Sequence, residues 1–245
     1  MKSLPLLAVL LALSACAVGP ARSVSQPETR PQAARYVTRA IHDEDGTGKS
    51  YFGRDIAKTM GPEGIPWLDR AERESQEQPA KVLAALALQG GETVVDLGAG
   101  SGFYVRRLAP LVGPQGKVIA VEVQEAMLAA LRERVAVEHL DNVEVVQGGD
   151  TDPKLATNSV DLALLVDVYH EFEYPFEMMS RVKEALKPGG RVVLVEYRSE
   201  DASVPIKPLH RMSEAQIRKE MSAVGLTYLA SVETLPWQHI VIFRK

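Results

Sequence analysis

The sequence predicts an α/β protein built on an open, doubly wound, mostly parallel sheet that closes with an antiparallel hairpin. Short apolar runs alternate with helical periodicity between residues 93 and 225, the order expected of repeated βα units. A glycine-rich turn follows the first of these strands, as in folds that bind a ligand at the carboxyl ends of their strands. Two final apolar stretches, separated by Pro236, have no helix between them and therefore predict a hairpin.

The composition fits a globular domain and excludes several kinds of site. The chain has 245 residues, of which 46% are hydrophobic, so it can bury a sizeable core. Its formal net charge of −4 offers no surface for a phosphate backbone, so no nucleic-acid partner is predicted. Cys16 is the only cysteine, which excludes an intrachain disulfide, a cysteine-based zinc cluster and a thiol nucleophile within the domain.

Residues 1–15 have the layout of a secretory signal peptide. Lys2 precedes an apolar run over 4–13, which is too short to span a bilayer as a mature helix. The run ends in Leu13-Ser14-Ala15-Cys16, which resembles the bacterial lipobox and implies a lipid on Cys16 that anchors the chain to the membrane. Ala17 in place of aspartate then implies the periplasmic face of the outer membrane. An ordinary signal peptide and an uncleaved anchor are the alternatives.

The next segment, 16–50, is predicted to be a flexible tether. Residues 17–35 are rich in Ser, Pro, Gln, Arg and Ala and lack any apolar period. Gly46-Thr47-Gly48 continues this loose composition. The tether would therefore connect the lipid to the folded part of the chain.

Residues 51–77 are predicted to form a helical cap or lid. The apolar spacing suggests short helical pieces that are broken at Gly61-Pro62 and at Gly64. The charge run over 70–77 has two interpretations. It is either a solvated helix face or a lid over the ligand, with Arg70 or Arg73 near a carboxylate.

The predicted main domain covers 78–245. Expected helices are 79–89, 103–108, 124–137, 176–186 and one from Ser213 to Gly225, and expected strands are 93–97, 118–121, 143–146, 160–168, 191–196, 226–235 and 238–243. Pro110 should end the second helix and Lys187-Pro188-Gly189-Gly190 the fourth, while Ser213 and Gln216 form a capping box. The uniformly apolar run 160–168 indicates a central strand that is buried on both faces.

The glycine-rich turn reads acid, x, Gly, x, Gly, x, Gly from Asp96 to Gly102. Glycine at Gly98 and Gly100 lets the backbone turn sharply and approach a ligand that any Cβ would obstruct. The dinucleotide fingerprint would need its third glycine where Phe103 stands, which disfavours a nicotinamide oxidoreductase.

This turn resembles motif I of class I S-adenosylmethionine (SAM) dependent methyltransferases, a family with a Rossmann-like seven-stranded sheet. The stretches 166–172, 187–190 and 194–198 are similar to the small-molecule members that act on quinones and sterols. The resemblance covers about 77–200. The Asn-Pro-Pro-aromatic motif of amide and adenine methylation is absent after the fourth strand. The lack of domain cysteines also argues against arsenite methylation, which needs thiols.

The resemblance implies SAM as the cofactor and assigns residues to it. Asp96, Gly98, Gly100 and Gly102 would hold the methionine part, and Glu122, a two-oxygen acceptor at the end of the second strand, would bind both ribose hydroxyls. Asp150 matches the position that contacts the adenine amino group. Asp167 is expected at the SAM amino group, with a role at the catalytic centre as the second assignment.

His170 is the candidate general base, because an imidazole titrates near neutrality. Capping of the next helix or a bond to the backbone is its structural alternative. Tyr169, Glu171 and Tyr197 are expected to line the substrate pocket or to pack at its rim. The remaining histidines have no spacing that suggests a metal site, so no metal is predicted.

The predicted function is SAM-dependent O- or C-methylation of a small or lipophilic acceptor by in-line displacement, in which the protein mainly aligns the nucleophile with the methyl group. The alternative is an exported SAM- or nucleoside-binding envelope protein that keeps the fold without turnover. Both would be exported, and for the methyltransferase the export signal and the cofactor motif point in different directions, because SAM is made in the cytosol while the signal directs the chain across the membrane. The acceptor and the oligomeric state are not predicted.

Overall fold

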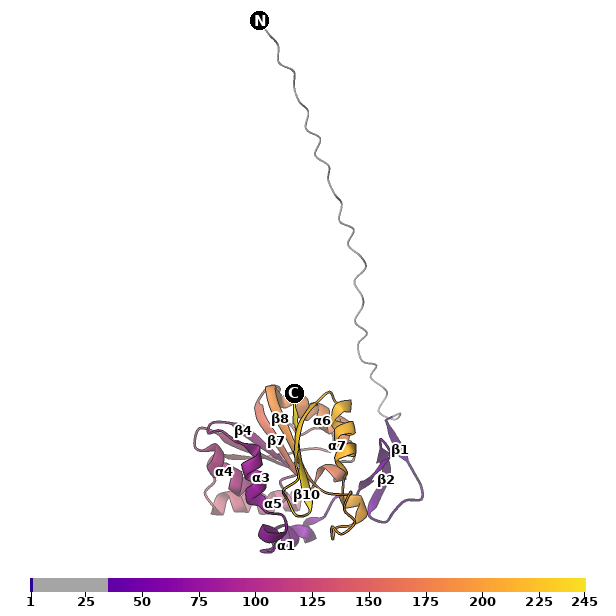
Figure 1. Cartoon of the computed structure of the whole chain (residues 1–245). Helices are drawn as coiled ribbons and strands as arrows, with labels where there is room; N and C mark the ends of the chain where they lie inside the picture. Colours follow the sequence, from indigo (N-terminus) through magenta and orange to yellow (C-terminus); the bar gives the residue numbers. More distant parts are fainter. Residues whose placement is uncertain (2–34) are drawn as a thin grey trace. The chain divides into compact units, whose positions relative to one another are not determined.

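The computed structural model describes Met1 and residues 35–245, in which a seven-stranded sheet is the central element (Figure 1). The predicted signal peptide, Cys16 and most of the predicted tether lie outside the described residues. In sheet order the strands are β6 (Val143–Gln147), β5 (Lys117–Glu122), β4 (Thr93–Leu97), β7 (Val160–Val166), β8 (Leu186–Tyr197), β10 (Gln238–Arg244) and β9 (Thr227–Val232). Five strands are parallel and β10 is antiparallel to both neighbours, which confirms the predicted fold class.

Strand β4 is the point at which the strand order reverses. It pairs with β5 on one side and with β7 on the other, and both pairings are parallel. The loops after β4 and β7 therefore diverge to opposite faces of the sheet, which opens a crevice at the carboxyl ends of these strands. Side chains alternate along β4, so Val95 and Leu97 pack on one face and Val94 packs on the other.

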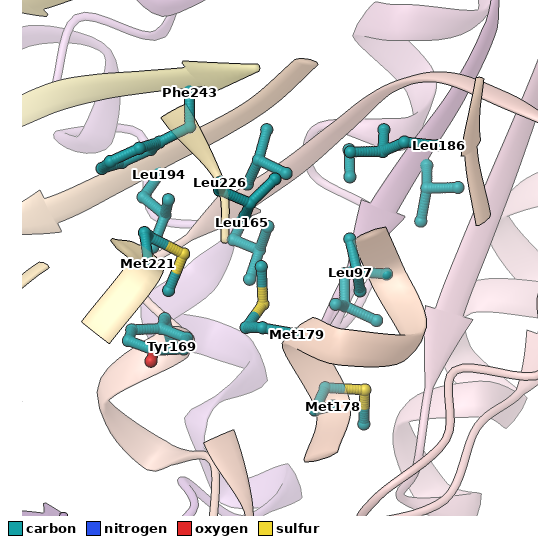
Figure 2. Packing of buried hydrophobic residues seen from close by; sticks show 14 of the residues in the cluster. Leu97, Leu165, Tyr169, Met178, Met179, Leu186, Leu194, Met221, Leu226 and Phe243 are labelled. Atoms are coloured by element: carbon teal, nitrogen blue, oxygen red, sulfur yellow. The ribbon is translucent and has the colours of Figure 1, made fainter. Parts of the chain in front are cut away.

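Helices cover both faces of the sheet. Their bounds are α1 (Ile65–Leu68), α2 (Arg73–Gln76), α3 (Pro79–Leu86), α4 (Val105–Val112), α5 (Glu125–Val137), α6 (Pro175–Ala185) and α7 (Glu214–Ala223). Figure 2 shows one core cluster, in which Met178 and Met179 of α6 and Met221 of α7 meet Leu165 and Phe243 of the sheet. Residues of α3 and α4 belong to the second core cluster, on the other face.

Two helix ends differ from the prediction. Pro110 does not stop α4, which continues to Val112 and ends at Gly113. Proline removes one hydrogen bond near the end of this short helix, whereas the extra turn buries Val112 completely, so packing outweighs the loss. Helix α3 ends earlier than expected, because Ala87 adopts a left-handed conformation before Gly90 and Gly91 are reached.

Two other sequence signals are largely confirmed. Helix α6 ends at Ala185, just before the predicted stop, although β8 begins earlier than expected, at Leu186. The hydroxyl of Ser213 accepts a hydrogen bond from the Gln216 backbone nitrogen at 3.1 Å, as a capping residue should. The Gln216 side chain instead donates to Glu220 at 2.7 Å, so only half of the capping box is present.

A second, three-stranded antiparallel sheet precedes the main domain, where a tether and helical cap were expected. It consists of β1 (Tyr36–Thr38), β2 (Gly46–Tyr51) and β3 (Arg54–Ala57). The prediction of loose structure at 46–48 and of helix from 51 is therefore wrong for this part. The described remainder of the cap does contain short helical pieces, namely a 3-10 helix (Pro62–Gly64), α1 and α2.

The small sheet is stabilised because its inward side chains are buried when it packs on the main domain. Tyr51, Ile56 and Ala57 are completely buried or nearly so. Phe52 and Gly53 both have positive φ, as the two-residue turn of a tight hairpin requires. Arg54 then forms a buried ion pair with Glu220 of α7 (Nε to Oε1 2.8 Å), which fixes β3 against the main domain.

Among the described residues, no helix is long and apolar enough to cross a membrane.

Candidate functional site

A cavity of about 610 Å³ lies at the carboxyl ends of β4, β5, β7 and β8. This volume is in the range of small-molecule binding sites. The position agrees with the rule that open α/β sheets bind ligands where the strand order reverses. Residues of the glycine turn and of the segment after β7 line the same cavity.

The glycine turn after β4 needs glycine at its first and third positions for steric reasons. Gly98 has a φ of +76°, and a Cβ there would lie 2.4 Å from Cγ2 of Val168. A Cβ on Gly102 would lie 2.7 Å from Cδ1 of Leu131. Gly98 and Gly100 line the cavity, whereas Gly102 allows the turn to pack against α5. The three predicted glycines thus have two different tasks.

Glu122 links the end of β5 to the glycine turn. Its Oε2 accepts a hydrogen bond from the Gly100 nitrogen at 3.0 Å, and its Oε1 accepts from the nitrogens of Val123 and Gln124 at 2.7 and 2.9 Å. The side chain is buried and lines the cavity. Oε1 thus already accepts two bonds and Oε2 accepts one, so Oε2 has capacity for one ligand hydroxyl. Asp150 follows β6 and lies exposed at the same cavity.

Asp96 lies beneath the turn rather than in the cavity wall. It is 3% exposed, and its Oδ2 has no hydrogen-bond partner among the described residues. Burial raises the pKa of Asp96 to about 7, with nearby Arg73 opposing the rise and Glu122 adding to it. Asp96 is not among the described residues that line the cavity, so the structure does not bring its carboxyl group to the cofactor position that the resemblance implies.

The charge run at 70–77 is solvated on one side, where Glu72 and Glu74 are exposed, and forms a buried ion cluster on the other. Arg73 and Glu77 are 4% and 1% exposed. Glu77 accepts from Arg73 Nε at 2.6 Å, from Arg70 Nη2 at 2.6 Å and from the Tyr197 hydroxyl at 2.8 Å. Arg73, Glu77 and Tyr197 also line the cavity, so this segment closes one side of it. Both arginines pair with Glu77 of their own segment, and a contact of either with a ligand carboxylate stays a prediction.

Asp167 lines the cavity and has one carboxylate oxygen that is buried without a partner. Its Oδ2 accepts from Gln238 Nε2 at 2.7 Å, while its Oδ1 is buried and has no partner among the described residues. Burial first, and then the charges of Glu77 and Glu196, raise the pKa of Asp167 well above its usual range. The residue also has a φ of +50°, a conformation that is uncommon for aspartate and found often at functional sites.

His170 is held at the cavity by a carboxylate behind it. Its Nδ1 lies 2.6 Å from Glu196 Oε2, and Glu196 also accepts from the Tyr169 nitrogen at 2.9 Å. Burial alone would lower the pKa of His170, but Glu196 raises it above the usual value. A carboxylate at Nδ1 fixes the ring orientation and favours the tautomer with its proton on Nδ1, which leaves Nε2 as the acceptor.

His210 joins this group from a distant part of the sequence. Its Nδ1 lies 3.1 Å from His170 Nε2 and 3.5 Å from Glu171 Oε1. His210 belongs to a 3-10 helix (Pro208–His210) that contacts the 3-10 helix carrying His170 (Tyr169–Glu171). Sequence spacing gave no sign of this contact, because helix α6, strand β8 and a loop separate the two histidines.

The predicted substrate-side residues differ in their placement. Glu171 and Tyr197 line the cavity, and Glu171 also accepts from the Met60 nitrogen at 3.2 Å. Tyr169 is 1% exposed, belongs to the core and donates its hydroxyl proton to Glu220 at 2.7 Å. The structure therefore places Tyr169 behind the wall and not in it. Sequence reasoning gave no site role to Glu196, although it ends a strand beside the cavity.

Comparisons with known proteins find methyltransferases among the relatives of this chain. A SAM-dependent methyltransferase of Aquifex aeolicus of known structure is 30% identical, with a TM-score of 0.72 over 76% of this chain and 99% of that one. Demethylmenaquinone methyltransferase of Lactococcus lactis is 26% identical over 64% of this chain and 61% of its own length. Arsenite methyltransferase of Halobacterium salinarum is 38% identical over 46% of this chain and 29% of its own length.

The chain spans less than two thirds of the length of these two curated relatives. Residues 88–241, well over half of the chain, match the methyltransferase domain family. The match agrees with the predicted cofactor, SAM, and it includes the glycine turn, Glu122 and the segment through His170. On this match and on the glycine turn at the sheet edge, the chain belongs to the methyltransferase domain family.

Proposed function

We propose that this chain transfers a methyl group from SAM to a small or lipophilic acceptor, at oxygen or carbon. The observation that carries the proposal is the presence of the glycine turn and of a buried histidine–glutamate pair at one cavity. The first supports a cofactor and the second supports removal of a proton from the acceptor.

The cavity suits a cofactor that carries a sulfonium and an ammonium group. Gly98 keeps the wall open at a place where a Cβ would clash, and Asp167 Oδ1 lacks a partner among the described residues. An ammonium group at Asp167 would satisfy that oxygen and favour the ionised carboxylate. Glu122 and Asp150 supply further acceptors along the cavity.

His170 is the proposed proton acceptor. SAM supplies the methyl group, and the acceptor atom forms a bond to the methyl carbon as the carbon–sulfur bond breaks. Nε2 of His170 lies 3.1 Å from His210 Nδ1, so the acceptor must displace this contact to reach it. With the Nδ1 proton held by Glu196, Nε2 then takes the proton that the acceptor loses, and the nearby carboxylate stabilises the imidazolium.

The cavity favours a small acceptor with apolar surface. Its lining includes Met60, Trp67, Phe172, Met178 and Ile206. The name of the Lactococcus relative agrees with a quinol-like acceptor of this kind. Arsenite is not proposed, since the chain has no cysteine beyond Cys16 to supply thiols.

Two measurements test this function. Calorimetry with S-adenosylhomocysteine on the full chain should show binding that Glu122→Ala weakens and that Glu125→Ala, at an exposed acid in the next helix, leaves unchanged. Glu196→Gln should keep the affinity and lower methyl transfer to a panel of hydroxylated quinols by about 10²- to 10⁴-fold.

The outcomes separate the possibilities. Absence of cofactor binding would refute the function altogether. Binding without transfer to any acceptor would instead favour the envelope binding protein. Transfer that Glu196→Gln leaves intact would show that the histidine is not the base.

We also propose that Cys16 carries a lipid and anchors the chain in the cell envelope, on the periplasmic face of the outer membrane. The support is the apolar run followed by Leu13-Ser14-Ala15-Cys16. Detergent phase partitioning should place the wild-type protein in the detergent phase and Cys16→Ser in the aqueous phase. Equal partitioning of the two would contradict lipid attachment, and membrane fractionation would test the assignment to the outer membrane.

A further inference from the structure

Three potential metal ligands meet at the wall of the cavity. They are His170 Nε2, Glu171 Oε1 and His210 Nδ1, and all lie within 4.8 Å of one another. The three separations are 3.1 Å between the ring nitrogens, 3.5 Å from His210 to Glu171 and 3.8 Å from His170 to Glu171. Ligand atoms about 2.0 to 2.1 Å from a tetrahedral ion are about 3.3 to 3.4 Å apart, which is close to these separations.

The ligand atoms are also held in place from behind. Glu196 contacts Nδ1 of His170 at 2.6 Å, which directs Nε2 toward the other two ligands. Such a carboxylate behind a ligating histidine is a recurring feature of metal sites. Arg54 Nη1 donates to the His170 carbonyl at 3.0 Å, and β3 contacts both short helices that carry the histidines.

The donor set indicates the kind of ion. Two imidazole nitrogens and one carboxylate oxygen suit a divalent first-row transition ion, whereas Mg²⁺ and Ca²⁺ prefer oxygen ligands. All three side chains line the cavity, so ligands on the opposite side of an ion would come from water or from the acceptor. This layout is that of an open catalytic site and not of a closed structural one.

We propose that His170, Glu171 and His210 bind one divalent transition-metal ion at the acceptor side of the cavity. The ion replaces the proton between the two imidazole rings. The evidence for metal binding is the geometry of the three side chains, whereas a role of the ion in methyl transfer depends on the proposed function. An acceptor hydroxyl bound to the ion would have a lowered pKa and would lose its proton to water, so that the histidine no longer needs to accept it.

The test is a metal titration of the full chain after treatment with EDTA. Zn²⁺ in competition with a coloured chelator should bind at one ion per chain, and Co²⁺ should give a visible spectrum typical of mixed nitrogen and oxygen ligands. His210→Ala and Glu171→Ala should each weaken Zn²⁺ binding by about tenfold or more, and Glu196→Gln by about 10- to 100-fold. His139→Ala, at an exposed histidine outside the cavity, is the matched control and should bind as the wild type does.

Two results would overturn the metal site. One is an affinity of the EDTA-treated wild type that does not exceed that of His210→Ala. The other is equal weakening in the control, which would indicate surface binding. Because His210 is partly exposed, its variant should fold even if Glu171→Ala does not, and circular dichroism checks this. Calorimetry with S-adenosylhomocysteine on the same metal-free samples separates the two proposals, since cofactor binding without metal binding refutes the site alone.

Discussion

Replacing Asp96 by asparagine should remove a pH-dependent loss of unfolding free energy. The wild-type carboxyl group is completely buried, and its Oδ2 lacks a partner among the described residues. Its pKa rises from an ordinary value of 3.8 to about 7 in the folded chain. The folded state thus binds the proton more tightly than the unfolded state does, so stability is highest at low pH and falls as the pH rises from 3.8 to about 7.

The size of the effect follows from the same two values. Complete ionisation at high pH costs the wild type about 4 kcal/mol relative to a chain with a neutral group at this position. Between about pH 5 and about pH 8 the loss is about 2.5 kcal/mol. The Asp96→Asn variant should therefore gain about that much stability relative to the wild type over this interval.

Urea unfolding followed by circular dichroism at the two pH values measures this difference. The wild type and the variant should have similar dependence of the unfolding free energy on urea concentration, so that only the midpoints shift. Asp141→Asn, at an exposed aspartate, is the control and should follow the wild type at both pH values. A constant stability difference between Asp96→Asn and the wild type would refute the assignment of a neutral buried carboxyl.

The remaining predictions concern the glycine turn, the ion cluster around Glu77 and the buried residue Arg54. Gly98→Ala should lower stability by about 1 kcal/mol or more and weaken cofactor binding in calorimetry, because the new Cβ would lie 2.4 Å from Val168. Gly91→Ala is the control: Gly91 also has a positive φ but no atom lies where its Cβ would be, so this variant should lose stability only. Glu77→Gln should cost about 3–5 kcal/mol in urea unfolding, since it leaves two arginines without their partner, whereas Glu74→Gln at an exposed pair should cost about 1 kcal/mol or less. Arg54→Met should loosen the backbone of the cavity histidine and lower turnover more than cofactor affinity, and unchanged kinetics would contradict that support role.

The central sheet could be predicted because its signals are local. A strand such as β7 is apolar at nearly every position, and only a strand buried on both faces needs that composition. The need for glycine at position 98 could likewise be predicted, because this glycine directly follows an apolar run. Glu122 and Asp167 follow strand ends, so their positions at the sheet edge come directly from the order of the strands.

The missed features depend on contacts between distant segments. The small sheet has Phe-Gly in its hairpin turn instead of the usual Asn-Gly, and its alternation is short, so nothing local distinguishes it from a loop. The run at 70–77 is charged, yet Arg73 and Glu77 satisfy one another and can be buried as a pair. His210 reaches His170 only through the packing of two short helices, which no spacing rule describes.

The segment before the matched domain has a consequence for how such enzymes diversify. Of the 33 described residues that line the cavity, ten come from positions 45–77, while the family match begins at residue 88. The cofactor turn and the segment through His170 lie entirely within the matched part. We therefore expect exchange of the segment before the matched domain to alter acceptor preference, while the glycine turn itself stays within the matched domain. A chimera that carries this segment from a relative should acquire a new acceptor range while it retains its affinity for the cofactor.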